Sequence, residues 1–384
     1  MKRLLLCSLL IAHCSLIFAY DIGLVLDQSL IYRGSGSDNV FEVNGVLIPS
    51  ISGLIGNTGE YFISAGFNYQ SNPWGYIPEL IEASLFLDLN YGFTTIGRMR
   101  YADPLGFISD GFFDGAQIVF DTRAGVFGLG AWYTGLICKR RANIEMTYDE
   151  WVHNKAAIDY SDFFDTYFAP RRLISSLEWE HPAIARHLGL NVSLLGQFDL
   201  SGEGLNTYYL TLKKTMPFRG FNFHFGSCLQ LIHYDGDIDA ALAAEMGLSW
   251  IWRRQGLSFL ARYSSGEQGP LTPFLPVTTV AQGEVIDARL SGLTVFSLDY
   301  TARLHRTFSF NFMPSYFIDN GGYNRVDNDG GLLGGEIFGK LNWSPFSDIM
   351  LSLGGGVFLP SLGNVARTAS NIWRTELNLI VSFF

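Results

Sequence analysis

Apolar and polar residues alternate one by one along most of this chain. In the last ten residues, Leu377, Leu379, Val381 and Phe383 alternate with mostly polar neighbours, and residues 188–194 repeat the pattern. A period of two residues predicts strands with one apolar face and argues against helices. The chain is therefore expected to be all-β.

Eighteen segments of this kind can be placed along the sequence. Strands that cross an outer membrane are about 9–11 residues long, with short turns at one end and longer loops at the other. The second and twelfth segments alternate weakly, so sixteen strands remain an alternative. The segments lie near residues 22–32, 42–55, 58–70, 80–90, 92–102, 111–121, 124–137, 169–179, 187–200, 204–215, 220–233, 237–251, 256–264, 289–304, 306–318, 332–344, 347–360 and 371–384.

The connections between these segments sort by length. If the first strand starts on the inner side of a membrane, the connections on the inner side are short and most connections on the outer side are long. The brief links at 201–203 and 234–236 are exceptions, because they also lie on the outer side. An even number of strands returns the C-terminus to the inner side. We therefore predict a transmembrane antiparallel up-and-down β-barrel of about 16–18 strands with both termini on one side.

The N-terminus has the pattern of a secretory signal peptide. Lys2 and Arg3 precede an apolar run, and Ala19 offers a small residue for cleavage. We predict a signal peptide over residues 1–19 and an outer-membrane barrel over residues 20–384.

A lipoprotein signal is an alternative interpretation of the same segment. Cys14 would be the lipidated residue, but His13 stands where a small residue is preferred. Beyond Ala19, no run approaches the roughly 20 apolar residues that a membrane helix needs. The chain would therefore cross a membrane only as strands.

Composition favours a barrel over soluble domains. Hydrophobic residues make up 48% of the chain but are spread over alternating positions, and aromatic residues reach 15%, which suits the girdles of a membrane barrel. Charged residues are only 16%, below the roughly 25% of soluble domains. The net charge of −10 and the lack of a basic cluster exclude nucleic acid as a partner.

Two of the four cysteines, Cys7 and Cys14, lie in the predicted signal peptide. Cys138 falls in an outer loop and Cys228 within a strand, so we expect two free thiols rather than a disulfide. No zinc spacing, phosphate loop or dinucleotide-binding pattern occurs, and we expect neither cofactor nor metal.

The longest predicted outer loop spans residues 138–170 and is rich in charged and aromatic residues. A long loop of this kind can fold inward and narrow a pore, or close over its mouth as a lid. The same aromatic residues could equally form an adhesive surface. We favour a constriction or a lid.

Charged positions opposite the apolar faces should line the lumen. A tight turn at Tyr91 would place Glu82 near Arg100 and Ser84 near Arg98, as in a charged porin constriction. Arg98 and Arg100 would share one face of their strand, and Met99 and Tyr101 would lie on the other face. A structural ion-pair ladder is the alternative. The predicted pore-lining residues are Glu82, Asp88, Arg98, Arg100, Glu178, Lys213, Arg262, Asp299, Arg303, Glu336 and Lys340.

Patterns typical of outer-membrane enzymes are weak or absent. An outer-membrane phospholipase needs a His-x-Ser pair on one strand face, and no histidine of the mature chain is followed two places later by serine. His233, Asp235, Asp237 and Asp239 could suggest a protease of the omptin type, but acidic hairpin tips are ordinary. We expect no enzymatic activity.

The signal peptide, the alternating strands, the sorted loops and the aromatic C-terminus together resemble bacterial outer-membrane porins over the whole chain. Gly97 and Arg98, Asp-Pro-Leu-Gly at 103–106 and Asp-Gly-Phe-Phe-Asp-Gly-Ala at 110–116 look like the pattern of substrate-selective or spirochaete-type porins. In the usual pattern the final aromatic residue lies on the apolar face of the last strand. Here Phe383 lies on that face and the final residue, Phe384, lies on the polar one. The resemblance implies a channel for passive diffusion of small hydrophilic solutes in the bacterial outer membrane.

The resemblance also implies partners. These are outer-membrane lipids, small solutes and the barrel-assembly machinery, engaged through the C-terminal strand; a homo-oligomer is left open. An outer-membrane transporter of hydrophobic or lipid-like substrates, of the fatty-acid transporter type, is an alternative, but such proteins begin with a segment inside the barrel, and here a strand is predicted almost at once. A barrel that acts as a surface adhesin is the third interpretation.

Overall fold

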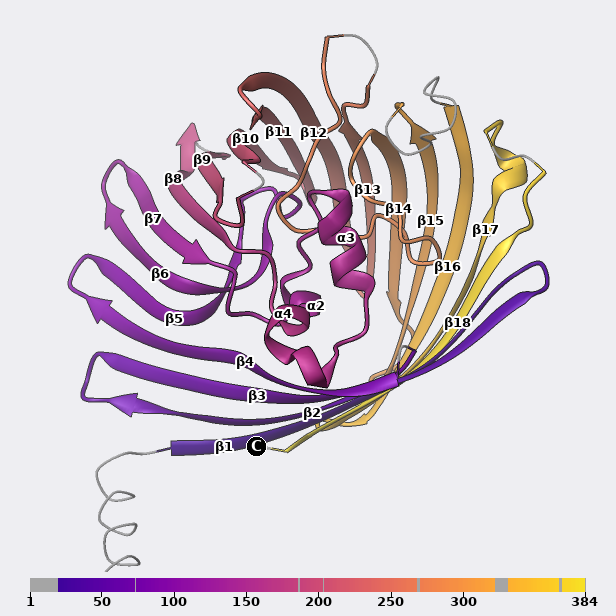
Figure 1. The fold of residues 1–384 in the computed structure, drawn as a ribbon, viewed down its shortest axis with the longest axis horizontal. Helices are drawn as coiled ribbons and strands as arrows, with labels where there is room; N and C mark the ends of the chain where they lie inside the picture. Colours follow the sequence, from indigo (N-terminus) through magenta and orange to yellow (C-terminus); the bar gives the residue numbers. More distant parts are fainter. Residues whose placement is uncertain are drawn as a thin grey trace, which may run out of the picture.

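Eighteen antiparallel strands form one closed sheet in this computed structural model (Figure 1). The structure describes residues 20–72, 74–185, 187–202, 204–267, 270–321, 331–365 and 368–383. The strands are β1 (Tyr20–Ser35), β2 (Asp38–Ile55), β3 (Gly59–Ser71), β4 (Trp74–Leu89), β5 (Gly92–Ala102), β6 (Asp110–Thr122), β7 (Gly125–Tyr133), β8 (Arg172–Ala185), β9 (Leu188–Asp199), β10 (Asn206–Phe218), β11 (Phe221–Tyr234), β12 (Asp237–Trp252), β13 (Gln255–Ser264), β14 (Leu293–Arg303), β15 (Phe308–Asp319), β16 (Gly331–Phe346), β17 (Ile349–Leu359) and β18 (Ile372–Phe383).

The seam of the barrel joins the two ends of the chain. Each strand pairs with its neighbours in sequence, and β1 also pairs with β18, from Leu24 opposite Phe383 to Ser35 opposite Ile372. The even number of strands puts residues 20 and 383 at the same end, as predicted, and the weakly patterned second and twelfth strands are present. The predicted signal peptide and Phe384 lie outside the described residues.

Alternation gives the barrel an apolar outer surface. A row of leucines crosses β7 to β11 on this surface, each opposite the next and 45–50% exposed: Leu129, Leu177, Leu194, Leu210 and Leu229. The residues next to them in sequence, such as Ser193 and Cys228, are buried inside. Outward leucines of this kind suit a lipid environment.

The helices are short and lie in the connections between strands. α2 (Lys139–Ala142), α3 (Tyr148–Lys155), η1 (Tyr160–Asp162) and α4 (Phe163–Tyr167) follow β7, and η2 (Pro360–Leu362) follows β17. Among the described residues, no helix is both long enough and apolar enough to cross a membrane.

Three connections at the end opposite the termini build the functional site. We number the connections at this end of the barrel along the chain, and these three are L3 (103–109), L4 (134–171) and L7 (265–292). They follow strands β5, β7 and β13, respectively. Some predicted strand ends deviate beside these loops, although the largest deviations are at the start of β4 and at the end of β8. The strands predicted over 169–179 and 289–304 begin instead at Arg172 and Leu293.

Candidate functional site

The L4 connection folds into the barrel rather than away from it. Figure 1 shows α2, α3 and α4 inside the ring of strands. A capping box starts α3: Thr147 Oγ1 accepts a hydrogen bond from Glu150 N at 3.3 Å, and the Glu150 carboxylate accepts one from Thr147 N at 3.1 Å. Ile137, Ile144 and Met146 of L4 join a buried cluster that also contains residues of the barrel wall. L4 therefore narrows the lumen.

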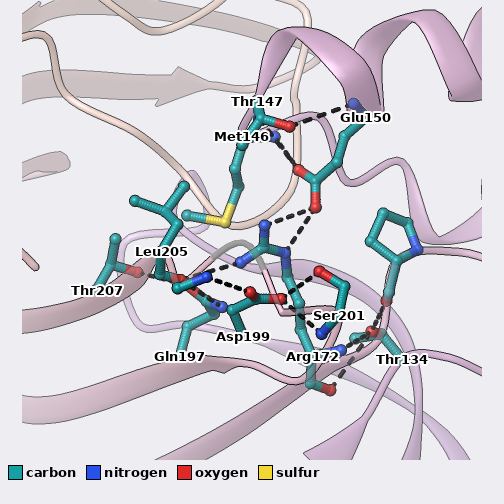
Figure 2. Close-up of polar contacts among 12 residues, drawn as sticks. Thr134, Met146, Thr147, Glu150, Arg172, Gln197, Asp199, Ser201, Leu205 and Thr207 are labelled. Carbon is teal, nitrogen blue, oxygen red and sulfur yellow. Dashed lines mark hydrogen bonds and ion pairs between the residues drawn. The ribbon is translucent and has the colours of Figure 1, made fainter. Parts of the chain in front are cut away.

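A buried ion pair ties α3 to the wall (Figure 2). Arg172, the first residue of β8, donates to Glu150 Oε1 from Nη2 at 2.6 Å and from Nε at 2.9 Å, and neither side chain is more than 5% exposed. Glu150 Oε2 accepts from Met146 N at 2.8 Å, and Arg172 Nη1 donates to Leu205 O at 3.3 Å. A buried pair is tolerated when its remaining donors and acceptors are satisfied. These contacts fix α3 against β8.

L3 is a compact turn built around one carboxylate. Asp103 Oδ1 accepts hydrogen bonds from Ile108 N and Ser109 N, and Oδ2 accepts from Leu105 N and Gly106 N, all at 2.8–3.1 Å. A carboxylate that accepts several backbone N–H groups fixes a tight turn. The conformation of L3 is therefore fixed by hydrogen bonds within the loop itself.

L3 crosses the lumen to the opposite wall. Lys213 on β10 donates to Pro104 O at 2.5 Å. The guanidinium carbon of Arg262 on β13 lies 4.8 Å from the centre of the Phe107 ring. Since L3 starts from β5, these contacts join two distant parts of the barrel wall.

L7 connects the other two loops. Val277 N and Thr278 N donate to Ile108 O of L3 at 2.7 and 3.1 Å. Thr279 N donates to Asn143 O of L4 at 2.9 Å. The three loops therefore form one hydrogen-bonded unit inside the barrel.

The far part of L7 is attached to β16 and β18. Glu336 on β16 accepts hydrogen bonds from Glu284 N at 2.6 Å and Ile286 N at 3.0 Å. Arg374 on β18 donates to Glu284 O at 2.7 Å. Glu284 keeps an exposed surface in the lumen, but partial desolvation raises the pKa of its carboxyl above its usual range, and Arg374 opposes the shift.

Ion pairs surround this attachment. Arg33 on β1 pairs with Asp287 of L7 at 3.0 Å, with side chains 30% and 63% exposed. Glu376 on β18 accepts from Lys340 at 3.1 Å and from Arg374 at 2.7 Å. Charges of both signs therefore lie beside the part of the lumen that the loops leave open.

The open part of the lumen is a polar cavity of about 720 Å³. It is walled by β1 to β3 and β15 to β18, on the side away from the cluster formed by L3 and L4. Asp27 and Lys340 are the charged residues on its wall, and serine and asparagine side chains supply most of the rest. The cavity can hold water and small hydrophilic molecules.

Several predicted pore residues hold the loops or pair with wall residues. Lys213 and Glu336 do so as described above. Arg262 pairs with Glu245 at 2.9 Å and donates to Gln282 of L7 at 2.7 Å. Glu178 accepts from the Tyr101 hydroxyl at 2.7 Å. Sequence reasoning treated these residues as free pore lining and did not foresee their structural contacts.

The remaining predicted residues lie nearer the end that carries the termini. Lys340 lines the open cavity, whereas Asp299 and Arg303 line a second cavity at the end of the barrel that carries the termini. Glu82 accepts from Ser84 at 2.9 Å, and Asp88 is exposed at the end of β4. Whether these side chains meet a passing solute stays a prediction.

The expected contacts of Glu82 with Arg100 and of Ser84 with Arg98 are wrong. In the β4 and β5 register, Arg98 lies opposite Ala83 and Gly97 lies opposite Ser84. Arg100 pairs instead with Asp110 at 3.0 Å and keeps 65% of its side chain exposed. The pairing of β3 with β4 contains a register shift between Ser64 and Ala65, which the sequence did not reveal. Ile81 lies in β4 beside this shift and is buried, although it was expected to face outward.

The inner face of β5 was also assigned wrongly. Met99 and Tyr101 are buried with Phe107 and Trp132 in the loop cluster, so the lumen side of β5 carries these apolar residues. Arg100 lies on the other face, because side chains alternate along a strand. It stands near the outer end of β5, where Asp110 compensates its charge.

Sequence reasoning missed the residues that fix the loops. A signal for α3 was available, because Thr147-Tyr-Asp-Glu150 has the capping-box spacing. No comparable signal announces that Arg172 reaches Glu150, because the contact depends on how L4 folds. Cys138 and Cys228 are both free and buried.

No protein-family model and no curated protein matches this chain. Solved structures are similar over nearly its full length. OccK2 (OpdF) of Pseudomonas aeruginosa has a TM-score of 0.69 at 10% identity, covering 95% of this chain and 97% of that one. The outer membrane protein opdK of the same organism has a TM-score of 0.65 at 11% identity, covering 95% and 98%. OccK11 (OpdR) has a TM-score of 0.62 at 13% identity, covering 95% and 96%. This chain has the fold of these proteins.

Proposed function

We propose that this chain is a bacterial outer-membrane channel for passive diffusion of small hydrophilic solutes. One observation carries the proposal: three loops fill one side of the lumen, while a polar cavity of about 720 Å³ stays open on the other. A barrel that served only as a support would not need this division. A narrowed, water-lined path is what selective diffusion requires.

The polar wall favours hydrophilic solutes over lipids. A transporter of fatty acids would need an apolar path, but the open cavity carries serine, asparagine and charged side chains. An adhesin would present its longest loop outward, whereas the helices of L4 lie inside the ring of strands (Figure 1). We therefore rank both alternatives below a channel, and we assign no reaction to the protein.

The outer surface supports the proposed location. Its exposed leucines match lipid, and the similar opdK is an outer membrane protein. Outer-membrane lipids and small solutes are thus the proposed partners. Assembly through the C-terminal strand by the barrel-assembly machinery, and association of several copies, are proposed on the resemblance to porins alone.

The solute size can be bounded by a neighbour. One crystal structure of OccK2 of Pseudomonas aeruginosa is in complex with glucuronate. We propose that this chain passes molecules of that size, which fit within a cavity of about 720 Å³.

Conductance of the refolded protein in a planar bilayer tests the function. Discrete openings in salt solution are expected, with block or permeation by small hydrophilic solutes. A folded barrel that stays electrically silent over a wide voltage range, but takes up a fatty acid, would support a lipid transporter instead.

A further inference from the structure

A row of uncharged polar side chains crosses the inner wall in one continuous register. Gln70 on β3 lies opposite Asn44 on β2, and Asn44 lies opposite Ser29 on β1. Across the seam, Ser29 lies opposite Asn378 on β18. Residues opposite each other in a sheet share a face, so these four side chains point into the lumen together.

The same row continues over three further strands. Asn378 lies opposite Ser352 on β17, Ser352 opposite Asn342 on β16, and Asn342 opposite Ser309 on β15. The Ser352 hydroxyl donates to Asn342 Oδ1 at 2.7 Å. All seven residues line the open cavity. We name this set, from Gln70 to Ser309, the amide-hydroxyl row.

The amide-hydroxyl row descends along the channel. Gln70 is the second-last residue of β3, at the outer end, and Ser309 is the second residue of β15, at the end that carries the termini. Neighbouring strands are about 4.8 Å apart, so seven strands give a row of roughly 29 Å. Because strands of membrane barrels tilt by about 35–45°, the row runs obliquely from one end of the lumen toward the other.

Part of the row has no partner within the protein. Among the described residues, Gln70 Oε1 is buried without a hydrogen bond. Amide and hydroxyl groups that lack partners gain free energy from a ligand or from ordered water. Asn342 Nδ2 donates to Ser309 Oγ at 3.4 Å, and Asn378 Nδ2 donates to Glu376 Oε1 at 3.3 Å. A solute would therefore meet the remaining donors and acceptors of the row where these side chains line the open cavity, and not the enclosed Gln70 Oε1.

The neighbouring inward row is partly apolar. Two residues further along the strands, Val46, Ile380 and Met350 line the same cavity, and Asp27 stands between the first two. A sugar ring presents hydroxyl groups at its edge, each both donor and acceptor, and C–H groups on its faces. A polar row beside an aliphatic one matches both parts of such a ring.

We propose that the amide-hydroxyl row is a binding path for uncharged polyhydroxylated solutes of the size of a mono- or disaccharide. The inference rests on the proposed channel function and names its substrate class. The row carries no formal charge, so it offers hydrogen bonds without favouring an ion of either sign. Successive side chains let a solute exchange its hydrogen bonds step by step as it moves.

Maltose block of single-channel current in the refolded full chain tests the proposal. Maltose should interrupt the current at millimolar concentration, and a poly(ethylene glycol) of matched size, which has few hydroxyl donors, should not. The double variant N44A/N378A should weaken maltose block roughly tenfold, as expected for the loss of two hydrogen bonds.

Asn191→Ala is the matched control. Asn191 on β9 lies opposite Lys213, outside the row, and its Oδ1 is also buried without a partner. This variant should keep the maltose block of the parent. If N44A/N378A fails to fold, S29A/S352A removes two hydroxyls of the same row and should weaken the block as well.

Three results would overturn the proposal. Equal block by maltose and by poly(ethylene glycol) would mean simple volume exclusion. Equal weakening in N191A would mean that any inward amide suffices. If the protein conducts but glucuronate blocks the current more strongly than maltose does, the path binds anions. The proposed channel function would then still hold. Silent protein would instead remove the channel function and this inference with it.

Discussion

Arg98 and Asp114 form a two-pronged ion pair, with Nε to Oδ1 and Nη2 to Oδ2 both at 2.8 Å. Arg98 also donates to Leu80 O of β4 at 2.7 Å and to Leu136 O of L4 at 2.9 Å. The side chain is 8% exposed. A single guanidinium therefore joins two strands other than its own to the start of the longest loop.

We expect Arg98→Ala to destabilise the barrel by about 2–4 kcal/mol, because it leaves Asp114 and two carbonyl groups without their donor. Arg98→Lys should not rescue it, since an ammonium cannot form both prongs. Urea unfolding in detergent measures the loss.

Arg100→Ala is the control for this prediction. The Arg100 side chain is 65% exposed in its pair with Asp110, so the change should cost less than about 1 kcal/mol. Equal losses in the two variants would mean that the contacts of Arg98 contribute little.

Glu150→Gln should loosen L4 without unfolding the barrel. The amide keeps one acceptor, but the buried Arg172 charge loses its counter-charge, which typically costs about 3–5 kcal/mol. The expected result is a noisier open-channel current with a higher mean conductance. Asp149→Asn, on the exposed side of α3, should leave the current unchanged. A quiet current in the Glu150 variant would contradict the anchoring role of the ion pair.

Deleting residues 144–164 should raise conductance, because the deleted segment contains α3 and lies in the lumen. The deletion also removes Glu150, so Arg172→Met should accompany it to avoid a buried unpaired charge. The measurement is single-channel conductance, with folding checked by heat-modifiable migration. Unchanged conductance in a folded deletion variant would place L4 outside the ion path.

Ion selectivity should depend on pH through Glu284. Partial desolvation raises its pKa, so the carboxyl is protonated at a higher pH than an ordinary glutamic acid. As the pH falls through this raised pKa, the lumen loses one negative charge beside Arg374 and Lys340, and selectivity should move toward anions. Reversal potentials in a salt gradient measure the shift. Glu284→Gln should show anion-leaning selectivity already at neutral pH and lose this step.

The barrel was predictable from the sequence because alternation is a local signal. Each strand needs one apolar face, so residues such as Leu377 and Leu379 reveal both the strand and its outer side. The common side of the termini then follows from an even number of strands, and closure follows because an unpaired sheet edge is not tolerated in lipid. The predicted strand ends deviated most at Trp74 and Ala185, where the observed strands are longer than the predicted ones, and deviated less at Tyr133, Arg172 and Leu293, where the chain enters or leaves an inward loop.

The lumen was less predictable because its contacts join distant segments. Glu336 was expected to face water, but it accepts two backbone N–H groups of L7. Arg100 was expected inside because the polar face of β5 was assumed to line the lumen. That assumption weakens near the outer end of a strand, where both faces meet water. Met99 and Tyr101 could turn inward only because L3 and L4 provide an apolar environment there.

The pairing of β1 with β18 has a consequence for the order of folding. Leu24 and Phe383 meet although nearly the whole chain separates them. In an unstructured chain, closing a loop of that length costs about 3 kcal/mol more than closing one of ten residues. Neighbouring hairpins should therefore form first, and the seam should close last. Until then, β1 and β18 each keep an unpaired edge, which is the hazard that an assembly factor holding the last strand would remove.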